Sequence, residues 1–482
     1  MRSSRCLRLF ENIYASRWIT SSRITTRELH KTAVRQTDGV YTALTEMRVK
    51  TPWIEALRKQ QKDGIDPRKK SDQHATPSDR DLTPKKMSDS YHRVVIPLAQ
   101  DPWLNDNYLN ANGHIRLGTI FMDLDALSGV IAYKHTGESV TTVTAAVDRI
   151  TINHPLKEIC DLELSGQVTF ATGRSSMEIS LQVAKAPKEG SQVQKEDVLM
   201  TCAFTMVSLD PSTKKSVKIS PVLVESEEER RLFALGEKNS NAKKALAKTA
   251  LRKQTPNDEE SDLIHAMWLR QLEYHDPNNP IRKPDNVVYM ESTRMHSSQI
   301  MQPQYRNRHN FMIFGGFLLK QTFELAFCCA AAFSHSRPTF VSLDPSTFEN
   351  PVPVGSVLYL TATVAYTDPP LVTTPDDVHR TSDVGSNLQD EASDSNYTRV
   401  QIRIDSKVRN IEHGETKPTG QFNYTFLVAQ DIKIMPKTYS EFMIWVDAKR
   451  RAERVSASIR GMEASDGRAQ APDDGKIDRI TE

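Results

Sequence analysis

A short segment of this chain reads Asn307-Arg308-His309-Asn310-Phe311-Met312-Ile313-Phe314-Gly315-Gly316-Phe317-Leu318-Leu319, a polar loop rich in asparagine that leads into an apolar helix at a glycine pair. The first turn of a helix leaves backbone N–H groups without intrahelical partners, and these groups can bind an acceptor. A more degraded copy occurs earlier in the chain, between Asn110 and Asp125. Two copies predict a duplicated domain with paired sites.

The same order of elements follows each copy. Apolar residues at helical spacing after Gly118, and the apolar run after Gly316, predict one long buried helix in each half. Beyond each helix, apolar residues alternate with period two, which indicates strands with one covered face. The alternating rows are Met177 to Val183, Val198 to Met206, Leu358 to Tyr366, Val400 to Ile404 and Phe422 to Phe426. Because helices do not alternate with strands, we predict an α+β fold in which a curved antiparallel sheet wraps around a long central helix in each half.

Length and charge restrict the possible functions. The 482 residues leave room for two domains of roughly 100–200 residues. With 63 basic and 61 acidic residues the charge is balanced, so no nucleic-acid or membrane-surface partner is expected. No apolar run approaches the ~20 residues that cross a bilayer, so no membrane span is expected. No metal-ligand spacing, phosphate loop or dinucleotide fingerprint is found, so no metal is expected.

The N-terminal segment 1–37 has the composition of a mitochondrial transit peptide, because basic residues with interspersed Ser and Thr are opposed by only two acidic residues. The alternative is a disordered basic tail. Beyond this segment, the cysteines lie in apolar stretches without metal-like spacing and are interpreted as reduced core residues. They are Cys160, Cys202, Cys328 and Cys329. We therefore expect a mitochondrial protein of the matrix.

Several longer motifs are spread over both halves. The second half contains Phe314-Gly315-Gly316-Phe317-Leu318-Leu319 with Glu324-Leu325-Ala326, then Ser336-Arg337-Pro338, Pro351-Val352-Pro353-Val354-Gly355-Ser356 and Pro436-Lys437-Thr438-Tyr439. The first half contains Arg116-Leu117-Gly118 with Asp123-Leu124-Asp125, and Gly173-Arg174-Ser175-Ser176-Met177-Glu178. Between about residues 90 and 450 the chain resembles hotdog-fold acyl-CoA thioesterases of the double hotdog type, most closely the mitochondrial acyl-CoA thioesterase 9 type.

The resemblance implies two tandem hotdog domains and a homo-oligomer of such double units. We place the domains at residues 90–222 and 286–450. The remaining segments are a flexible lead-in at 38–89, a charged helical linker at 223–285, a disordered insertion at about 368–396 and a polar C-terminal tail at 451–482.

Thioester hydrolysis needs a base that activates water and donors for the developing oxyanion. The resemblance implies that a carboxylate on the central helix of one domain works with an asparagine from the loop before the central helix of the other. The family's acid falls seven positions after the second glycine, which from Gly118 gives Asp125. From Gly316 the count gives Phe323, with Glu324 one residue later and turned by about 100° around the helix. Asp125 is therefore the favoured base and Glu324 the secondary candidate.

The family's asparagine lies seven positions before the first glycine. In the first half the count from Leu117, which replaces that glycine, gives Asn110. In the second half it gives Arg308, and a one-residue insertion would move the position to Asn307, with Asn310 as the alternative.

The favoured site thus pairs Asp125 with Asn307, and the pairing of Asn110 with Glu324 is the degenerate alternative. For the oxyanion or thioester we expect the helix starts, namely Gly118, Gly315, Gly316 and Phe317. Arg174 and Arg337 are candidates for the CoA phosphates, the alternative being ordinary surface residues at turns.

The resemblance implies hydrolysis of acyl-CoA to free fatty acid and CoA by activated water, in a site shared between the two domains. No cofactor is expected, because CoA is part of the substrate and product. Two other hypotheses stay open. Phe323 and Leu117, which depart from the family pattern, suggest a non-catalytic hotdog scaffold or acyl-CoA sensor. His114 and His309, near the loops before the helices, suggest a hotdog dehydratase or hydratase.

Overall fold

The computed structural model describes residues 44, 51–62, 82–152, 158–187, 191, 193–211, 213–248, 253–278, 281–307, 311–373 and 397–465. The expected transit peptide, Asn310, His309 and residues 374–396 of the expected insertion lie outside these ranges.

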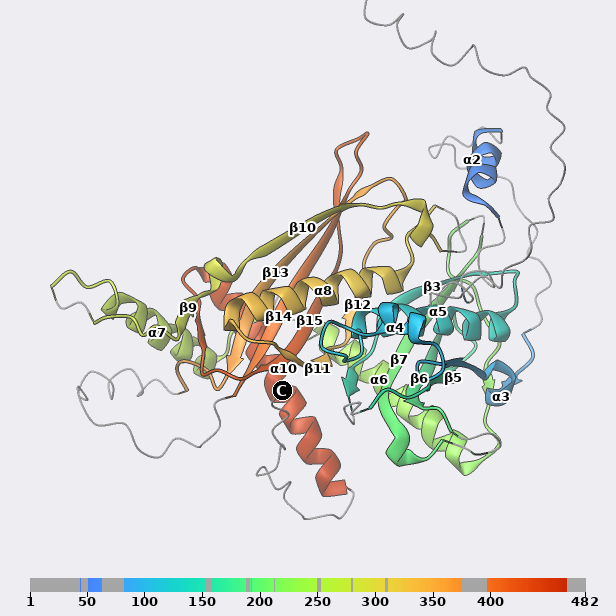
Figure 1. The fold of residues 1–482 in the computed structure, drawn as a ribbon, viewed down its shortest axis with the longest axis horizontal. Coiled ribbons are helices and arrows are strands. Elements are labelled where there is room, and N and C mark those ends of the chain that lie inside the picture. Colours follow the sequence, from blue (N-terminus) through green and yellow to red (C-terminus); the bar gives the residue numbers. More distant parts are fainter. Residues whose placement is uncertain are drawn as a thin grey trace, which may run out of the picture. The chain divides into compact units, whose positions relative to one another are not determined.

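Two long helices form the centres of the two halves (Figure 1). They are α5 (Leu117–Thr136) and α8 (Gly315–Ser334), each of 20 residues and buried over most of its length. Both end at a residue with positive φ, Gly137 at 74° and His335 at 49°, a backbone conformation that stops a helix. The helices predicted after Gly118 and Gly316 are thus confirmed.

The composition of α8 corrects the expectation that no apolar run in the chain approaches the length of a membrane span. By length and composition this helix is apolar enough to cross a membrane, although 61% of its most apolar window is buried inside the protein. A helix that is hydrophobic on all sides is found in a membrane or in a core. Here α8 packs against β13, β14 and β15, so its apolar character is explained by the core.

A 12-stranded sheet packs against the two helices. The first half provides β2 (His92–Ile96), β3 (Thr141–Val147), β4 (Ile150–Ile152), β5 (Leu162–Ala171), β6 (Ser176–Lys185) and β7 (Val198–Leu209). The second half provides β10 (Met295–Ile300), β11 (Thr339–Leu343), β12 (Ser346–Thr347), β13 (Val357–Asp368), β14 (Thr398–Arg409) and β15 (Thr416–Val428). The order is β10-β13-β14-β15-β11-β4-β7-β6-β5-β2, and β3 pairs with both β7 and β12. All these pairs are antiparallel, and the α+β class is confirmed.

The two halves of the sheet join at its centre. β4 pairs with β11, where Ile150 lies opposite Leu343, and β3 pairs with β12, where Val147 lies opposite Ser346. Backbone hydrogen bonds therefore run without interruption from one half of the chain to the other. A continuous sheet of this kind leaves no open edge between the halves.

The strands at this junction show which residues of the two halves are equivalent. A β-bulge follows Thr144 where β3 pairs with β7, and a β-bulge follows Phe340 where β11 pairs with β15. Just beyond each bulge, Asp148 and Asp344 donate their backbone N–H groups to β7 and β15 at 2.8 and 2.9 Å. Thr144 and Phe340 therefore occupy the same position in the two halves.

The repeat extends beyond the main sheet. In the first half β1 (Lys85–Lys86) pairs in parallel with β8 (Val222–Leu223), and α6 (Glu227–Lys248) follows. In the second half β9 (Val287–Tyr289) pairs in parallel with β16 (Lys433–Met435), and α10 (Tyr439–Ser465) follows. Residues 85–89, which were expected in the lead-in, thus belong to the folded first half. Likewise, α10 continues through position 450, where the sequence suggested that a polar tail begins.

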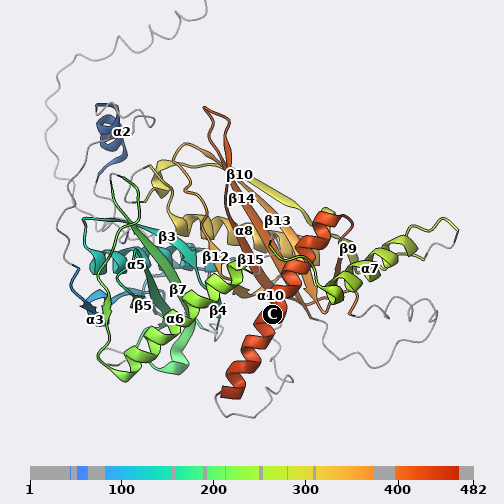
Figure 2. The same cartoon turned by 180° about the vertical axis from the view of Figure 1, so that it is seen from behind.

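The interpretation of residues 223–285 as helical agrees with α6 and α7 (Asp258–Glu273). Figure 2 shows α6 and α10 in front of the strands, on the face opposite α5 and α8. α6 packs on β5 through Phe233 and Phe170, whose ring centroids lie 4.9 Å apart. α7 is tied to α10, because the Arg450 guanidinium donates from Nε and Nη2 to both carboxylate oxygens of Glu260 at 2.6 Å.

The remaining helices are short. They are α2 (Trp53–Lys62), α3 (Met87–Ser90), α4 (Pro102–Tyr108), η1 (Lys195–Asp197), η2 (Met290–Thr293) and η3 (Pro303–Tyr305). Helix α2 lies within residues 38–89, which were expected to form a mostly flexible lead-in with a short amphipathic piece around Trp53.

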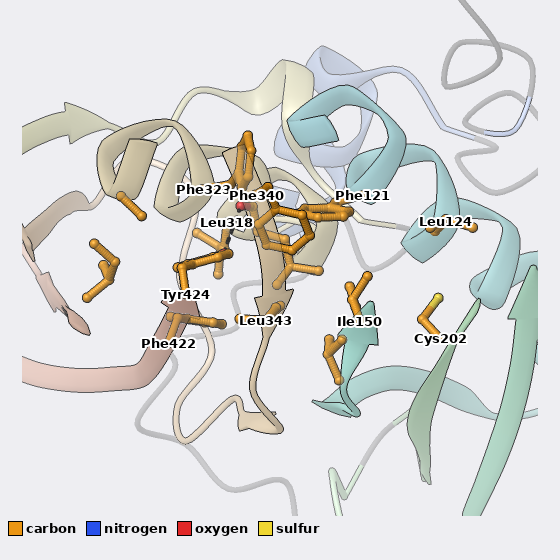
Figure 3. Close-up of a cluster of buried hydrophobic side chains, with 14 of the residues drawn as sticks. Phe121, Leu124, Ile150, Cys202, Leu318, Phe323, Phe340, Leu343, Phe422 and Tyr424 are labelled. Atoms are coloured by element: carbon orange, nitrogen blue, oxygen red, sulfur yellow. Dashed lines mark hydrogen bonds between the residues drawn. The ribbon is translucent and has the colours of Figure 1, made fainter. Parts of the chain in front are cut away.

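An aromatic cluster fills the space where the two halves meet (Figure 3). The ring of Phe323 on α8 lies 5.3 Å from Phe121 on α5, 5.5 Å from Phe340 and 5.9 Å from Tyr424, in edge-to-face geometry. Pairs of this geometry stabilise a core beyond the burial of their area, by about 0.5–1.5 kcal/mol each. The two halves therefore share one core.

Candidate active site

Asp125 lies in the middle of α5 with 1% of its surface exposed. One carboxylate oxygen, Oδ1, accepts a hydrogen bond of 2.7 Å from the hydroxyl of Thr144 in β3. The other, Oδ2, accepts a hydrogen bond of 2.6 Å from the backbone N–H of Gly316, in the first turn of α8. A carboxylate from the first half is thus held at the start of the central helix of the second half.

These two contacts fix the plane of the carboxylate. The N-terminus of a helix carries partial positive charge, which stabilises an anion placed there. Each carboxylate oxygen has two acceptor positions, so an oxygen that accepts from one donor can in general accept from a second donor as well. The arrangement is suited to a base that orients and deprotonates water.

The glycine pair makes this approach possible. A Cβ atom added to Gly315 would lie 3.2 Å from Oδ2 of Asp125, and one added to Gly316 would lie 2.9 Å from the backbone oxygen of Met122 and 2.7 Å from the ring of Phe314. The bulge after Thr144 is the local feature of β3 beside this site, and bulges commonly re-aim a side chain near an active site.

The equivalent position in the other half is apolar. A Cβ atom added to Gly118 at the start of α5 would lie 3.4 Å from the ring of Phe323, so Phe323 faces Gly118 as Asp125 faces Gly316. Phe340 replaces Thr144, and its ring centroid lies 5.5 Å from that of Phe323. A pair of phenylalanines therefore stands where the first site has a carboxylate and a hydroxyl.

Glu324, the secondary candidate for the acid, points elsewhere. Its carboxylate lies 3.5 Å from Nη2 of Arg116, the residue that precedes α5, and 43% of its side chain is exposed. An exposed pair of this kind contributes little to stability. Because Glu324 is one residue beyond Phe323, its carboxylate lies beside the guanidinium of Arg116 and not at the position that faces the start of α5.

The two loops before the central helices have matching hydrogen bonds. In the first, the N–H of Asn110 donates to the backbone oxygen of His114 at 2.8 Å. In the second, the N–H of Asn307 donates to Met312 at the same distance. The second loop is one residue longer between these partners, so Asn307 is the equivalent of Asn110, as an insertion requires. Asn310 lies outside the described residues.

The side chain of Asn110 is used within its own loop. Its oxygen Oδ1 accepts from the backbone N–H groups of Asn112 at 2.9 Å and His114 at 3.1 Å. Asparagine often stabilises tight turns in this way. Asn110 thus supports the turn of its loop, and the structure does not bring it together with Glu324 in any recorded contact among the described residues.

The expected oxyanion donors are engaged by protein groups. The N–H of Gly316 donates to Asp125, and the N–H of Phe317 donates to the backbone oxygen of Phe314 at 3.2 Å. Gly118 packs against Lys320 and Phe323. The start of α8 therefore holds the carboxylate in this structure, and the expected contact of the Gly316 or Phe317 N–H with a thioester oxygen stays a prediction.

The arginines proposed for CoA lie on exposed links between elements. Arg174 is in the turn between β5 and β6, where its carbonyl accepts from the N–H of Ile219 at 3.0 Å. Arg337 lies between α8 and β11, at the C-terminal end of α8, whose 20 residues span about 30 Å. No contact in the described part of the chain joins either arginine to Asp125.

Thr144 was not found by sequence reasoning. Its position in a strand, 19 residues after Asp125, gives no local sign of a role. The internal repeat is the signal that could have found it. Aligning the strand after α5 with the strand after α8 places Thr144 opposite Phe340. A polar residue in the first half thus corresponds to an aromatic residue in the second, as Asp125 corresponds to Phe323.

A second charged cluster lies on the outer face of the sheet, beneath α6. Lys243 of α6 donates to Asp148 at 2.7 Å and to the hydroxyl of Thr205 at 2.6 Å, and it lies 3.5 Å from Glu178. Asn239 donates to Glu178 at 3.0 Å. Burial, together with the nearby Asp148 carboxylate, raises the pKa of Glu178 to about 7. Burial also raises the pKa of Asp148, against the opposing effect of Lys243.

Within the described ranges, no group of three or more His, Cys, Asp or Glu side chains could hold a metal ion. Burial raises the pKa of the Cys329 thiol to about 12 and raises that of Cys202 still further. Both cysteines pack in the core as thiols, and Cys328 is exposed.

The chain is similar over most of its length to named enzymes. It is 32% identical over 391 residues to mitochondrial acyl-coenzyme A thioesterase 9 of Mus musculus, a match that spans 79% of this chain and 81% of the relative. It is 33% identical over 384 residues to the enzyme of the same name from Homo sapiens, over 78% of this chain and 80% of the relative.

No protein-family model matches the chain. Among solved structures, an acyl-ACP thioesterase from Bacteroides thetaiotaomicron covers 71% of this chain and 99% of its own, at 9% identity and a TM-score of 0.37, too low to bear on the fold or the site. The two sequence relatives each match about four fifths of both chains at about one third identity. This chain therefore belongs to the family of mitochondrial acyl-coenzyme A thioesterases 9.

Proposed function

We propose that this protein hydrolyses acyl-CoA thioesters to free fatty acid and CoA. The observation that carries the proposal is the buried carboxylate of Asp125, held between the Thr144 hydroxyl and the N–H of Gly316. The family to which the chain belongs supports the same reaction, since its relatives are named acyl-coenzyme A thioesterases.

Water is the nucleophile in this proposal. Asp125 takes a proton from water as the oxygen attacks the thioester carbonyl carbon. The tetrahedral intermediate then collapses, the carbon–sulfur bond breaks, and the thiolate of CoA leaves and receives the proton from Asp125. Thr144 and Gly316 hold the carboxylate in place through both steps, and such fixed orientation is a large part of enzymatic rate enhancement.

The partner of Asp125 in this proposal is Asn307, with Asn310 as the alternative, and its amide holds the carbonyl of the substrate. The support for Asn307 is its place in the loop that leads directly to the start of α8, where Gly316 contacts Asp125. In this interpretation the two halves are tandem hotdog domains that share one site. Gly315 contributes by allowing α8 to approach Asp125.

The position with Phe323 and Phe340 is proposed to be inactive, because neither side chain can accept a proton. Glu324 and Asn110 then have structural roles. Arg174 and Arg337 remain proposed contacts for the phosphates of CoA, which would have to reach exposed links of the fold.

We also propose the protein's setting. The relatives named above are mitochondrial, which supports a mitochondrial location, and the basic segment 1–37 supports import into the matrix. The reaction as proposed needs no cofactor, since water and a carboxylate suffice. Assembly into a homo-oligomer of double-hotdog units is part of the same proposal.

The test is hydrolysis by the purified protein of a panel of acyl-CoA esters from acetyl to palmitoyl. Asp125→Ala is expected to lower kcat/KM by about 10²–10⁴-fold, the usual contribution of a general base. Glu324→Ala, a carboxylate on the other central helix, is the matched control and is expected to stay within about twofold of wild type, because its exposed ion pair contributes little.

Two results would count against the proposal. If the wild-type protein hydrolyses no ester of the panel, the proposed hydrolase activity is wrong, and binding of acyl-CoA without turnover is favoured. Full activity of Asp125→Ala would leave the reaction standing and remove Asp125 as its base.

A further inference from the structure

The two loops before the central helices are supported differently. In the first, the side chain of Asn110 closes the turn by accepting two backbone N–H groups, and residues 111–114 are exposed. The second loop is one residue longer, and a segment far away in the sequence packs against it. This segment is Thr51 with helix α2, here called the N-terminal clasp.

The clasp touches the second loop at two points. The ring of Trp53, the first residue of α2, lies edge-on to the ring of Phe311, with centroids 5.6 Å apart. The guanidinium of Arg306 donates from Nη2 to the backbone oxygen of Thr51 at 3.0 Å. Its other terminal nitrogen, Nη1, donates to Pro303 at the same distance, so the arginine links the clasp to η3.

These contacts flank Asn307 on both sides in the sequence. Arg306 precedes it directly, and Phe311 precedes Met312, whose backbone oxygen accepts from the Asn307 N–H. Ile313, one residue further, is fixed to Val352 by a backbone hydrogen bond of 2.8 Å. The described part of the loop is thus fixed at its base by the segment that precedes β13 and at its sides by the clasp.

The clasp is a packed element of the fold. Ala56, on the same face of α2, is 5% exposed, whereas Ile54 is 54% exposed. An aromatic edge contact and a hydrogen bond to a charged donor contribute about 0.5–1.5 and 1.5–3 kcal/mol respectively. Contacts of this size are enough to favour one loop conformation over others by a factor of ten or more.

We propose that the N-terminal clasp is a positioning element of the thioesterase reaction, and that Trp53 and Arg306 act through Asn307. This inference rests on the proposed function of the site. The clasp holds the loop so that the Asn307 amide meets the thioester carbonyl while Asp125 activates water. The loop of the inactive position has the side chain of Asn110 to support it and carries no such clasp among the described residues.

The expected effect is on turnover more than on binding. A shift of about 1 Å in a positioning group can lower a rate by up to about 10²-fold. We therefore expect Trp53→Ala to lower kcat by about 5–50-fold with little change in KM. Trp53→Phe, which keeps an aromatic edge for Phe311, should restore most of the rate. The matched control is Trp103→Ala, because Trp103 lies on α4 in the first half of the chain and is 54% exposed.

A double-mutant cycle tests the route through Asn307. If Trp53 acts by positioning this residue, Trp53→Ala combined with Asn307→Ala should be about as slow as Asn307→Ala alone. Independent, multiplying effects of the two substitutions would overturn the proposal. So would a Trp53→Ala protein with wild-type kcat and an unaltered melting curve.

A second measurement does not depend on turnover. Amide hydrogen exchange of residues 306, 307 and 311–313 should become faster in Trp53→Ala than in wild type, while exchange of residues 109–115 should stay the same. Unchanged exchange in the second loop would overturn the clasp. If wild type is inert on every acyl-CoA but exchange responds as expected, the proposed reaction fails and the clasp on the loop stands.

Discussion

At the scale of residues, two exchanges separate the two equivalent positions of this molecule. Asp125 and Thr144 face the start of α8, whereas Phe323 and Phe340 face the start of α5. Both members of the polar pair have been replaced together. A carboxylate left beside Phe340 would lose the hydroxyl that orients it and be buried among aromatic rings, which is costly.

A pH-dependent stability is expected from Glu178. Its pKa is about 7 in the folded protein, raised mainly by burial from 4.5, so between these two pH values the folded state binds a proton that the unfolded state has released. Stability contributed by this group is therefore present at low pH and is lost as the pH rises through about 7. Glu178→Gln keeps the shape of the protonated acid, so relative to wild type it should be more stable at pH 8 by roughly 1–3 kcal/mol and unchanged near pH 5.

Thermal unfolding of both proteins from pH 5 to pH 8.5 measures this difference. The same substitution at Glu324, which has 43% of its side chain exposed, serves as the control for removal of a carboxylate. A Glu178→Gln protein that loses stability at pH 8 would mean that the ion pair with Lys243 outweighs the cost of burial.

At the scale of elements, the site depends on how closely the start of α8 approaches α5. The N–H of Gly316 reaches the Asp125 carboxylate at 2.6 Å because neither glycine of the pair carries a side chain. The start of α5 approaches α8 less closely at Gly118, where the nearest contacts are with the flexible side chain of Lys320 and the ring of Phe323. The two glycines are equivalent in sequence but differ in the space around them.

Alanine substitutions at Gly316 and Gly118 test this difference. Gly316→Ala places Cβ 2.9 Å from the Met122 backbone oxygen, so α8 must move and the bond to Asp125 must lengthen. We expect a loss of about 1–3 kcal/mol in stability and about 10²-fold in kcat. Gly118→Ala meets its nearest atom at 3.3 Å and gains helix propensity of about 1 kcal/mol, so its stability and activity should stay near wild type. Equal effects at the two positions would argue against a tight approach only at α8.

At the scale of the whole molecule, the two halves form one structure. The sheet passes from β4 to β11 without a break, and Phe121 of α5 packs against Phe323 of α8. The outer helices follow the same repeat. Lys243 of α6 pairs with Asp148 in the first half, and Arg451 of α10 lies 3.6 Å from Asp344 in the second half. The cores are therefore not independent.

A chain cut between residues 252 and 253 tests this unity. Co-expressed fragments 1–252 and 253–482 are expected to purify together and to retain activity, because backbone pairing and the aromatic core hold them. Fragment 1–252 alone should lose at least about 10²-fold in kcat/KM, since it has Asp125 without the α8 start that holds it. A folded, fully active first fragment would contradict the shared core.

The sequence by itself determined the repeated helix-and-sheet pattern, since the apolar spacing around α5 and α8 is a local property. Counting from the glycines with the spacing that the family resemblance implies then gave Asp125 as the acid, Phe323 at the equivalent position of the second half, and Asn307 as the loop asparagine after a one-residue insertion. Those predictions depend on counting along a duplicated pattern, which needs no knowledge of distant contacts. The roles of these residues stay predictions for the experiments above.

Only the tertiary structure decided which groups meet. The bond between Asp125 and Gly316 joins residues 191 positions apart, and that between Arg306 and Thr51 joins residues 255 apart. Thr144 became part of the site through the pairing of strands, and the N-terminal clasp through one aromatic contact and one hydrogen bond. Local periodicity says which face of an element is buried, whereas its neighbours there depend on how the whole sheet closes. For this reason Asp125 could be predicted as the base from the family resemblance of the chain, whereas the residues that hold it could not be predicted.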